Sequence, residues 1–141
     1  MHLTNAIELP DGTWIRGRGL RDPAPDDTPG YGLYLGSRRL RRRHDAALTW
    51  CHDWIEWPDF LLPRDRAAAV RQIGKLHEEA QAGRAEVACG GGVGRTGTVI
   101  ACLAVLSGLP PEEAVAWTRA NYNKRAVETP WQRRWVGNYR K

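Results

Sequence analysis

The stretch from Ala85 to Leu106 constrains the fold of this chain more than any other feature. Ala85-Glu86-Val87-Ala88 predicts a short buried strand, and the run from Thr98 to Leu106 is apolar on every side, which predicts a central helix. Five glycines lie between or beside them, within residues 90–97. A strand, a glycine-rich turn and a buried helix in this order indicate an α/β domain that binds its ligand at the carboxyl end of the strand.

The remaining sequence predicts further strands and helices around this segment. Strands are expected at Thr13–Arg16, at Tyr31–Leu35 and within Ala46–Trp57, and helices are expected to open at Pro63, Pro110 and Pro130, the last running to about Tyr139. We therefore expect one domain over residues 1–141, although residues 1–30 fit the plan only loosely. Its core is a small mixed sheet of four or five strands, with the strand that leads to Cys89 in the centre and helices around it.

The charge of the chain comes almost entirely from arginine. The formal net charge is +5, and 18 of the 21 basic residues are arginines, a bias typical of a bacterium with a GC-rich genome. Residues Arg38 to Arg43 hold five arginines in six positions. Because blocks of like charge usually stay solvated, we expect a mobile loop there. Binding of a nucleic acid or of an inositol phospholipid head group is the alternative, but nucleic-acid binding is not expected as the primary role.

The cysteines and the hydropathy of the chain limit the classes of protein to which it can belong. The three cysteines at 51, 89 and 102 form no CxxC pair, and no histidine cluster has zinc-ligand spacing, so we expect no disulfide scaffold, no metal and no cofactor. Cys102 is expected to be a small core residue. The N-terminus lacks an apolar signal segment, and the longest apolar run, Val99 to Leu106, is far too short to span a membrane. These features predict a cytoplasmic protein without a membrane span.

Two nucleotide-binding motifs compete for the glycine-rich turn and both fit poorly. Gly92-Val93-Gly94-Arg95-Thr96-Gly97 satisfies the dinucleotide fingerprint, but Pro110-Pro111 and another helix follow where a second strand with an acidic ribose ligand should come. A Walker A loop needs Gly at position 89 and Lys at position 95, where this chain has Cys and Arg. Neither motif explains the turn.

A cysteine at the end of a buried strand, before a glycine-rich turn and a helix N-terminus, suggests an anion-directed nucleophile. Backbone N–H groups and the helix dipole make such a position electropositive, and electropositive settings lower the pKa of a thiol. Arg95, six residues after Cys89, can place its planar fork over the same loop and match two oxygens of a phosphate. The hydroxyl of Thr96 is placed to hydrogen-bond the sulfur.

The pattern of Cys89, five residues and Arg95-Thr96-Gly97 resembles the phosphate loop of the cysteine-based protein tyrosine phosphatase superfamily. Trp57-Pro58-Asp59 is similar to the mobile loop that bears the general acid in that family, and the two motifs occur in the family's order. The segment from Ala126 to Gln132 is similar to one in compact dual-specificity members. The resemblance covers roughly residues 31–136.

The resemblance implies a two-step hydrolysis of a phosphomonoester without a metal. Cys89 is the expected nucleophile, Arg95 the phosphate clamp and Asp59 the general acid and then base, with Thr96 assisting the sulfur. The expected phosphate-binding backbone comprises Gly90, Gly91, Gly92, Val93, Gly94 and Arg95. Gln132 is expected either to position the hydrolytic water or to form a helix capping box with Thr129. Asp53 and Glu56 are weaker candidates for the acid.

Two positions near the motifs, Ala88 and Cys51, bear on what the resemblance implies. Family members usually carry His directly before the nucleophile, whereas this chain has Ala88, and we expect activity to survive with a less acidic thiol. In some relatives a second cysteine traps the oxidised nucleophile as a disulfide, which makes Cys51 a candidate disulfide partner of Cys89.

The binding partner that the resemblance implies is a phosphorylated substrate. It is either a phosphoprotein with phosphotyrosine or mixed phosphoresidues, or a small phosphorylated metabolite or nucleotide. A non-catalytic phosphate-binding module is the alternative function.

Overall fold

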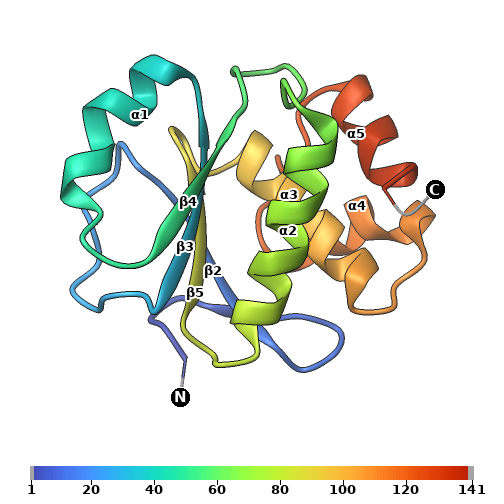
Figure 1. Ribbon diagram of the computed structural model, residues 1–141. Coiled ribbons are helices and arrows are strands. Elements are labelled where there is room, and N and C mark those ends of the chain that lie inside the picture. The colour runs from blue at the N-terminus through green and yellow to red at the C-terminus, as the bar shows by residue number, and fades with distance from the viewer. Residues whose placement is uncertain (1, 140–141) are drawn as a thin grey trace.

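Five strands form one mixed sheet in the computed structural model, which describes residues 2–139 (Figure 1). The strands are β1 (Ile7–Glu8), β2 (Trp14–Gly19), β3 (Tyr31–Gly36), β4 (His52–Glu56) and β5 (Ala85–Cys89). Their order across the sheet is β1-β2-β5-β3-β4. The β1–β2 pair is antiparallel and the other pairs are parallel. The predicted small mixed sheet, with the strand of Cys89 in its centre, is confirmed.

Helices cover both faces of this sheet unequally (Figure 1). Among residues 2–139, one face carries α1 (Arg38–His44) alone, which continues into the 3-10 turn η1 (Asp45–Ala47). The other carries α2 (Arg66–Ala80), α3 (Gly94–Leu106), α4 (Pro111–Asn121) and α5 (Pro130–Gly137). Within residues 2–139, no helix has the length and apolar character needed to cross a membrane.

The main core lies between the sheet and the α2–α5 layer. Helix α3 is its centre, since every residue from Gly94 to Val105 is buried, as the all-apolar pattern predicts. From the sheet, Leu33 and Val87 are fully buried in this core, and from α2 Ile73 and Leu76 are too. The core therefore fixes the start of α3 directly behind the end of β5.

Capping residues set the helix boundaries that the sequence pattern placed only approximately. The carboxylate of Asp65 accepts a hydrogen bond from Ala68 N at 3.0 Å, so α2 begins at Arg66 and not at Pro63. Helix α3 already begins at Gly94, inside the glycine-rich turn. The side chain of Thr129 caps α5, which ends at Gly137.

The predicted mobile loop at Arg38 to Arg43 is wrong, because these residues form α1. The hydroxyl of Ser37 accepts a hydrogen bond from Leu40 N at 3.2 Å and caps the helix. Leu40 is buried against the sheet in a small second core, whose other members are Leu20, Tyr34, Leu48 and Ala88. Arginine is also a good helix former, so a cap and one buried anchor are sufficient to order this basic segment.

A buried polar network fills the rest of the face under α1. The Glu86 carboxylate is fully buried and accepts hydrogen bonds from Arg16 Nε at 2.8 Å, Arg18 Nε at 2.9 Å and the Tyr34 hydroxyl at 2.7 Å. Trp50 Nε1 donates to the same Tyr34 hydroxyl at 2.7 Å. Side chains alternate along a strand, so Glu86 and Ala88 face this network while Val87 and Cys89 face the main core.

Candidate active site

Cys89 ends β5 and lies at the base of a tight turn that leads into α3. Its side chain is buried, and the backbone N–H of Gly92 donates to its Sγ at 3.2 Å. Gly92 adopts φ +75°, and a Cβ there would lie 2.5 Å from the backbone of Arg18 and Gly19. Only glycine fits this position, and its N–H is thereby directed at the sulfur.

Residues 89–95 form a candidate anion cradle, in which the N–H of Gly92 points at Cys89 Sγ. Residues 89–95 are consecutive in one turn, and the first-turn amides of α3 have no acceptor within the helix. The positive end of the helix dipole adds to their effect. The structure thus brings together the expected phosphate-binding residues Gly90, Gly91, Gly92, Val93 and Gly94, with Gly91 exposed at the mouth. A dianion is the ligand that such a cradle suits best.

Arg95 connects this cradle to the segment Trp57-Pro58-Asp59. Its guanidinium is buried, and Nη1 donates to the carbonyl oxygen of Trp57 at 2.9 Å. Its Nε lies 3.5 Å from Oδ1 of Asp59 and has no hydrogen-bond partner among residues 2–139. Because Arg95 lies on the turn that begins at Cys89, it brings the half-exposed side chain of Asp59 next to that turn.

The loop that carries Asp59 is anchored from α5. Trp57 is fully buried and donates from Nε1 to the carbonyl oxygen of Leu61 at 2.8 Å. Trp131 Nε1 donates to the carbonyl oxygen of Phe60 at 2.6 Å, and Gln132 Nε2 donates to that of Leu61 at 3.1 Å. Together these bonds hold the two residues that follow Asp59.

Both ends of the Gln132 amide are engaged by the backbone. Besides the bond to Leu61, its Oε1 accepts from the N–H of Glu128 at 3.1 Å, and the side chain is fully buried. The Gln132 N–H donates to Thr129 Oγ1 at 3.1 Å, which is the first half of the expected capping box. The second half of the capping box is not formed, because Gln132 Oε1 accepts from the N–H of Glu128 and not from that of Thr129. This arrangement ties α5 to the loop that carries Asp59.

Thr96 is buried in the first turn of α3, behind the cradle. Its Oγ1 has no hydrogen-bond partner in the described part of the chain, so the expected bond to Cys89 Sγ is not formed in this structure. A buried hydroxyl without a partner is rare in folded proteins. The Thr96 hydroxyl is therefore available as a hydrogen-bond donor next to the turn that begins at Cys89.

Two residues that sequence reasoning missed contact the cradle from other elements. Tyr122, at the end of α4, donates from its hydroxyl to the carbonyl oxygen of Gly92. Burial, followed by the electrostatic influence of the nearby Cys89 and Asp22 side chains, raises the pKa of Tyr122, which keeps this donor protonated. Arg21 packs its guanidinium against Gly90, where a Cβ would lie 2.6 Å from Nη1. Neither residue belongs to a motif, so no local signal could have found them.

Cys51 cannot form the hypothesised disulfide with Cys89. Gly32 of β3 pairs with both His52 and Glu86, so Cys51 lies at the level of Ala85, at the opposite end of the parallel strands. Four residues along a strand are about 13 Å, well beyond the roughly 7 Å limit on the Cα separation of a disulfide. The sequence spacing alone could not reveal this, because it does not give the strand register.

The weaker acid candidates lie outside the site. Asp53 accepts a hydrogen bond from the Tyr31 hydroxyl at 2.6 Å and pairs with Lys75 at 3.0 Å. Glu56 pairs with Arg38 and Arg64 on the surface. No group of three or more His, Cys, Asp or Glu side chains within residues 2–139 could hold a metal ion.

The remaining cysteine, Cys102, is fully buried in α3, as expected of a core residue. Burial raises the pKa of its thiol well above the usual range. The three cysteines are all free. Among them, only Cys89 lies at a turn of backbone donors.

Comparison with known proteins identifies the family. The family model of the Swiss Army Knife protein DSP-PTPase phosphatase domain, PTP-SAK, matches residues 63–135, slightly more than half of the chain. The chain belongs to this family. Its relatives are cysteine-based protein tyrosine and dual-specificity phosphatases, and the chain is an enzyme of that type. A search of curated proteins found no match.

Solved structures show the PTP-SAK chain to have the dual-specificity phosphatase fold. Kinase-associated phosphatase, crystallised with its catalytic cysteine replaced by serine, superposes with a TM-score of 0.72 at 16% identity, covering 96% of this chain and 93% of that one. Tk-PTP in its active form superposes with a TM-score of 0.63 at 23% identity, covering 95% of each chain. The predicted family and fold class are confirmed.

Proposed function

We propose that this phosphatase hydrolyses phosphomonoesters through a cysteinyl-phosphate intermediate formed on Cys89. The observations that carry the proposal are the hydrogen bond from the Gly92 N–H to Cys89 Sγ and the contact of Arg95 with Asp59, at the two ends of the turn of residues 89–95. A thiolate attacks phosphorus in line, and the bond from phosphorus to the ester oxygen breaks. Asp59, in its protonated form, delivers its proton to the leaving oxygen.

The second step returns the enzyme to its starting state. Asp59, now a carboxylate, takes a proton from a water molecule that attacks phosphorus, and the sulfur–phosphorus bond breaks to regenerate the thiolate. Arg95 and the loop amides hold the three equatorial oxygens as charge develops on them. The unpartnered hydroxyl of Thr96 supports a role in stabilising the departing sulfur. We also propose that Gln132 positions the hydrolytic water, in addition to anchoring the loop that carries Asp59.

The proposed substrate is either a phosphoprotein or a small phosphorylated molecule. The three free cysteines are compatible with the cytoplasm as the compartment. All the chemistry is proposed to reside in the one domain of residues 1–141. It needs no metal, since Arg95 and backbone amides neutralise the phosphate.

The first experiment measures phosphate release from para-nitrophenyl phosphate by the wild type and by Cys89→Ser and Asp59→Asn. We expect Cys89→Ser to abolish turnover while still binding inorganic phosphate. Asp59→Asn should lower kcat by about 10²–10⁴ on a substrate with a poor leaving group, such as phenyl phosphate, and much less on para-nitrophenyl phosphate. Glu56→Gln, on the same segment but outside the site, is the control. Turnover that survives Cys89→Ser would overturn the mechanism.

A panel of phosphopeptides, nucleoside monophosphates and sugar phosphates then separates the substrate classes. If no compound is hydrolysed while phosphate still binds to the wild type, the non-catalytic phosphate-binding module replaces this proposal. Retention of Cys89, Arg95 and Asp59 in one site argues against that outcome.

A further inference from the structure

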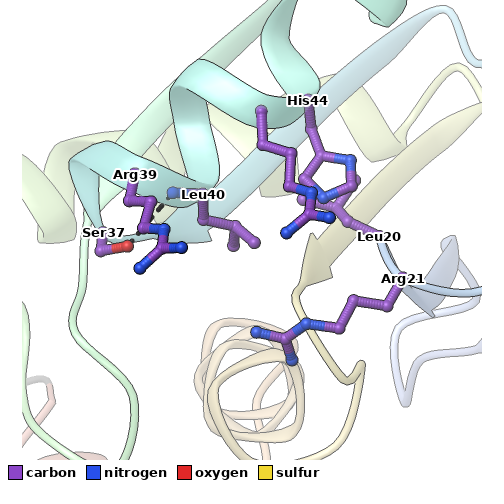
Figure 2. A pocket seen from close by; sticks show the side chains of 7 residues that line it. Leu20, Arg21, Ser37, Arg39, Leu40 and His44 are labelled. Atoms are coloured by element: carbon purple, nitrogen blue, oxygen red, sulfur yellow. Dashed lines mark hydrogen bonds between the residues drawn. The ribbon is translucent and has the colours of Figure 1, made fainter.

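A basic pocket lies under α1, next to the phosphate cradle but separate from it. Its volume is about 560 Å³. The lining side chains come from α1, from its cap and from the turn after β2, and they are Leu20, Arg21, Ser37, Arg39, Leu40, Arg43 and His44. Figure 2 shows the guanidinium groups of Arg21 and Arg39 and the ring of His44 around one space, with Leu40 between them. Neither Cys89 nor Arg95 lines it.

The positive charge of this pocket is not neutralised by the protein. No carboxylate lines it, and Arg21, Arg39 and Arg43 form no ion pair with any residue in the range 2–139. By contrast, the neighbouring Arg38 pairs with Glu56. Three unpaired guanidinium groups around one cavity form a site for an anion with several oxygens, because each guanidinium can donate in a bidentate manner.

His44 provides an independent sign that the pocket lacks an anion partner. Its Nε2 is buried and has no hydrogen-bond partner among the described residues. Burial, and then the positive charges of Arg43, Arg21 and Arg18, lower the pKa of His44. A bound anion would relieve both effects, since it would accept a hydrogen bond from the imidazole and offset the neighbouring cations.

Arg21 connects the pocket to the turn that begins at Cys89. Its backbone N–H donates to the carbonyl oxygen of Gly90 at 3.1 Å, and Leu20 N–H donates to that of Cys89 at 2.8 Å. Its guanidinium packs on Gly90, so closely that a Cβ there would lie 2.8 Å from Cζ. The side chain of Arg21 therefore contacts Gly90, the residue after the proposed nucleophile, and also lines the basic pocket.

We propose that this pocket is a second anion site, which receives a second phosphate group of the same substrate molecule while the first lies over Cys89. The preferred substrate is then a small molecule with two phosphates, and not a singly phosphorylated side chain. A soluble bisphosphate and a bisphosphorylated lipid head group share this chemistry. The inference rests on the proposed phosphatase function and specifies its substrate class.

The test compares matched substrates in the wild type and in a double variant, Arg39→Gln with Arg43→Gln. The pairs are inositol 1-phosphate with inositol 1,4-bisphosphate, and adenosine 5′-monophosphate with adenosine 3′,5′-bisphosphate. The control is Arg41→Gln with Arg42→Gln, which removes the same charge from the same helix but from residues that do not line this pocket. Para-nitrophenyl phosphate, with one phosphate, reports the basal activity.

We expect the wild type to prefer at least one bisphosphate over its monophosphate partner. The double variant should lose about tenfold or more in kcat/KM on that bisphosphate, equivalent to the loss of one charge-assisted hydrogen bond. Its activity on para-nitrophenyl phosphate and the control's activity on all compounds should stay within about twofold of the wild type. Calorimetry on Cys89→Ser, with and without the double substitution, should show the same loss in affinity for the bisphosphate.

Other outcomes overturn the inference and are separable from failure of the proposed function. Absence of Cys89-dependent turnover of para-nitrophenyl phosphate would remove the function itself. If that turnover is present but mono- and bisphosphates react and bind alike, or if the control loses as much as the double variant, the second site is wrong. A doubly phosphorylated peptide preferred over both bisphosphates would overturn the small-molecule assignment. Preference for a bisphosphorylated phosphoinositide in vesicles over the free head group would identify a lipid as the source.

Discussion

Arg95 Nη1 donates to the carbonyl oxygen of Trp57 at 2.9 Å, so the proposed phosphate clamp also holds the loop that carries Asp59, the proposed general acid. The Nε of the same guanidinium lies 3.5 Å from the Asp59 carboxylate and has no hydrogen-bond partner among residues 2–139. One planar group thus joins the two halves of the site and keeps donors for substrate. Its five N–H groups make this double role possible.

Arg95→Lys is predicted to lose activity although the charge is retained. A lysine ammonium cannot donate to Trp57 and also present two parallel N–H groups to phosphate. We expect kcat to fall by roughly 10²–10³ or more, as for the loss of a donor that stabilises the transition state. Steady-state kinetics on para-nitrophenyl phosphate measures this. Arg71→Lys, at an exposed position of α2, is the matched control, and an Arg95→Lys enzyme as active as that control would refute the dual role.

Gln132→Leu is predicted to act through the loop that carries Asp59. The substitution leaves the Leu61 carbonyl and the Glu128 N–H without their partners, which should cost about 1–3 kcal/mol of unfolding free energy. Formation of the cysteinyl phosphate should slow together with its hydrolysis, because Asp59 is proposed to serve both steps. Stopped-flow measurement of leaving-group release should therefore show no enhanced burst.

A role of Gln132 in positioning water alone has a different signature. Gln132→Leu would then release one equivalent of leaving group rapidly, turn over slowly afterwards and unfold at the wild-type denaturant concentration. Gln81→Leu, at an exposed glutamine at the end of α2, controls for the change in side-chain polarity.

The sequence predicted the parts of the site that are local and missed those that depend on register. Cys89 to Arg95 are consecutive, so their geometry follows from one turn between a strand and a helix. Trp57 and Pro58 mark Asp59 in the sequence as a candidate, and the structure adds its contact with Arg95, which is long-range in the chain. Arg21 and Tyr122 reach the cradle from distant segments without any motif, and only the packed structure shows them.

The basic segment shows how charge patterning can mislead. Five arginines in six positions indicate a solvated loop, yet a single cap at Ser37 and one buried leucine, Leu40, make it a helix. In the same way, the disulfide between Cys51 and Cys89 that some relatives suggested is wrong, because the strand register, which the sequence does not reveal, keeps the two residues apart. Both errors concern tertiary context and not residue chemistry.

Ala88→His, which introduces the residue usual in the family, is predicted to destabilise this protein. Ala88 is fully buried, and in the sheet it pairs with Tyr34 on one side and Arg18 on the other. Its methyl group packs in the small core under α1, so an imidazole there would overpack the site at a cost of about 1–3 kcal/mol. Thermal unfolding measures the loss, with Ala88→Ser as a control of smaller volume. A variant that is as stable as the wild type and more active would show that the site can accept the imidazole.

Acid is predicted to weaken the contact between the β1–β2 turn and α2, through Asp11. The Asp11 carboxylate accepts hydrogen bonds from Thr13 N at 3.0 Å and Thr13 Oγ1 at 2.6 Å, and it pairs with His77 Nε2 at 2.7 Å. Burial opposes ionisation, but these hydrogen bonds outweigh it and lower the pKa of Asp11 to about 2. Because the folded pKa lies below the ordinary value of about 3.9, ionised Asp11 stabilises the fold above that pH. This contribution should diminish as the pH falls from about 4 toward 2.

Urea unfolding between pH 5 and pH 2.5 tests the effect of Asp11 on stability. Asp11→Asn should be less stable than the wild type at pH 5, and the gap between the two should narrow toward pH 2.5, because the wild-type carboxylate becomes protonated there. Asp26→Asn, at an exposed aspartate without a partner among the described residues, should keep a constant difference from the wild type. If the gap between Asp11→Asn and the wild type stays constant with pH, the hydrogen-bonded carboxylate does not contribute through its charge. Cys89, the proposed nucleophile, lies at the opposite end of the sheet from this turn, so phosphatase activity at neutral pH should be unaffected by Asp11→Asn.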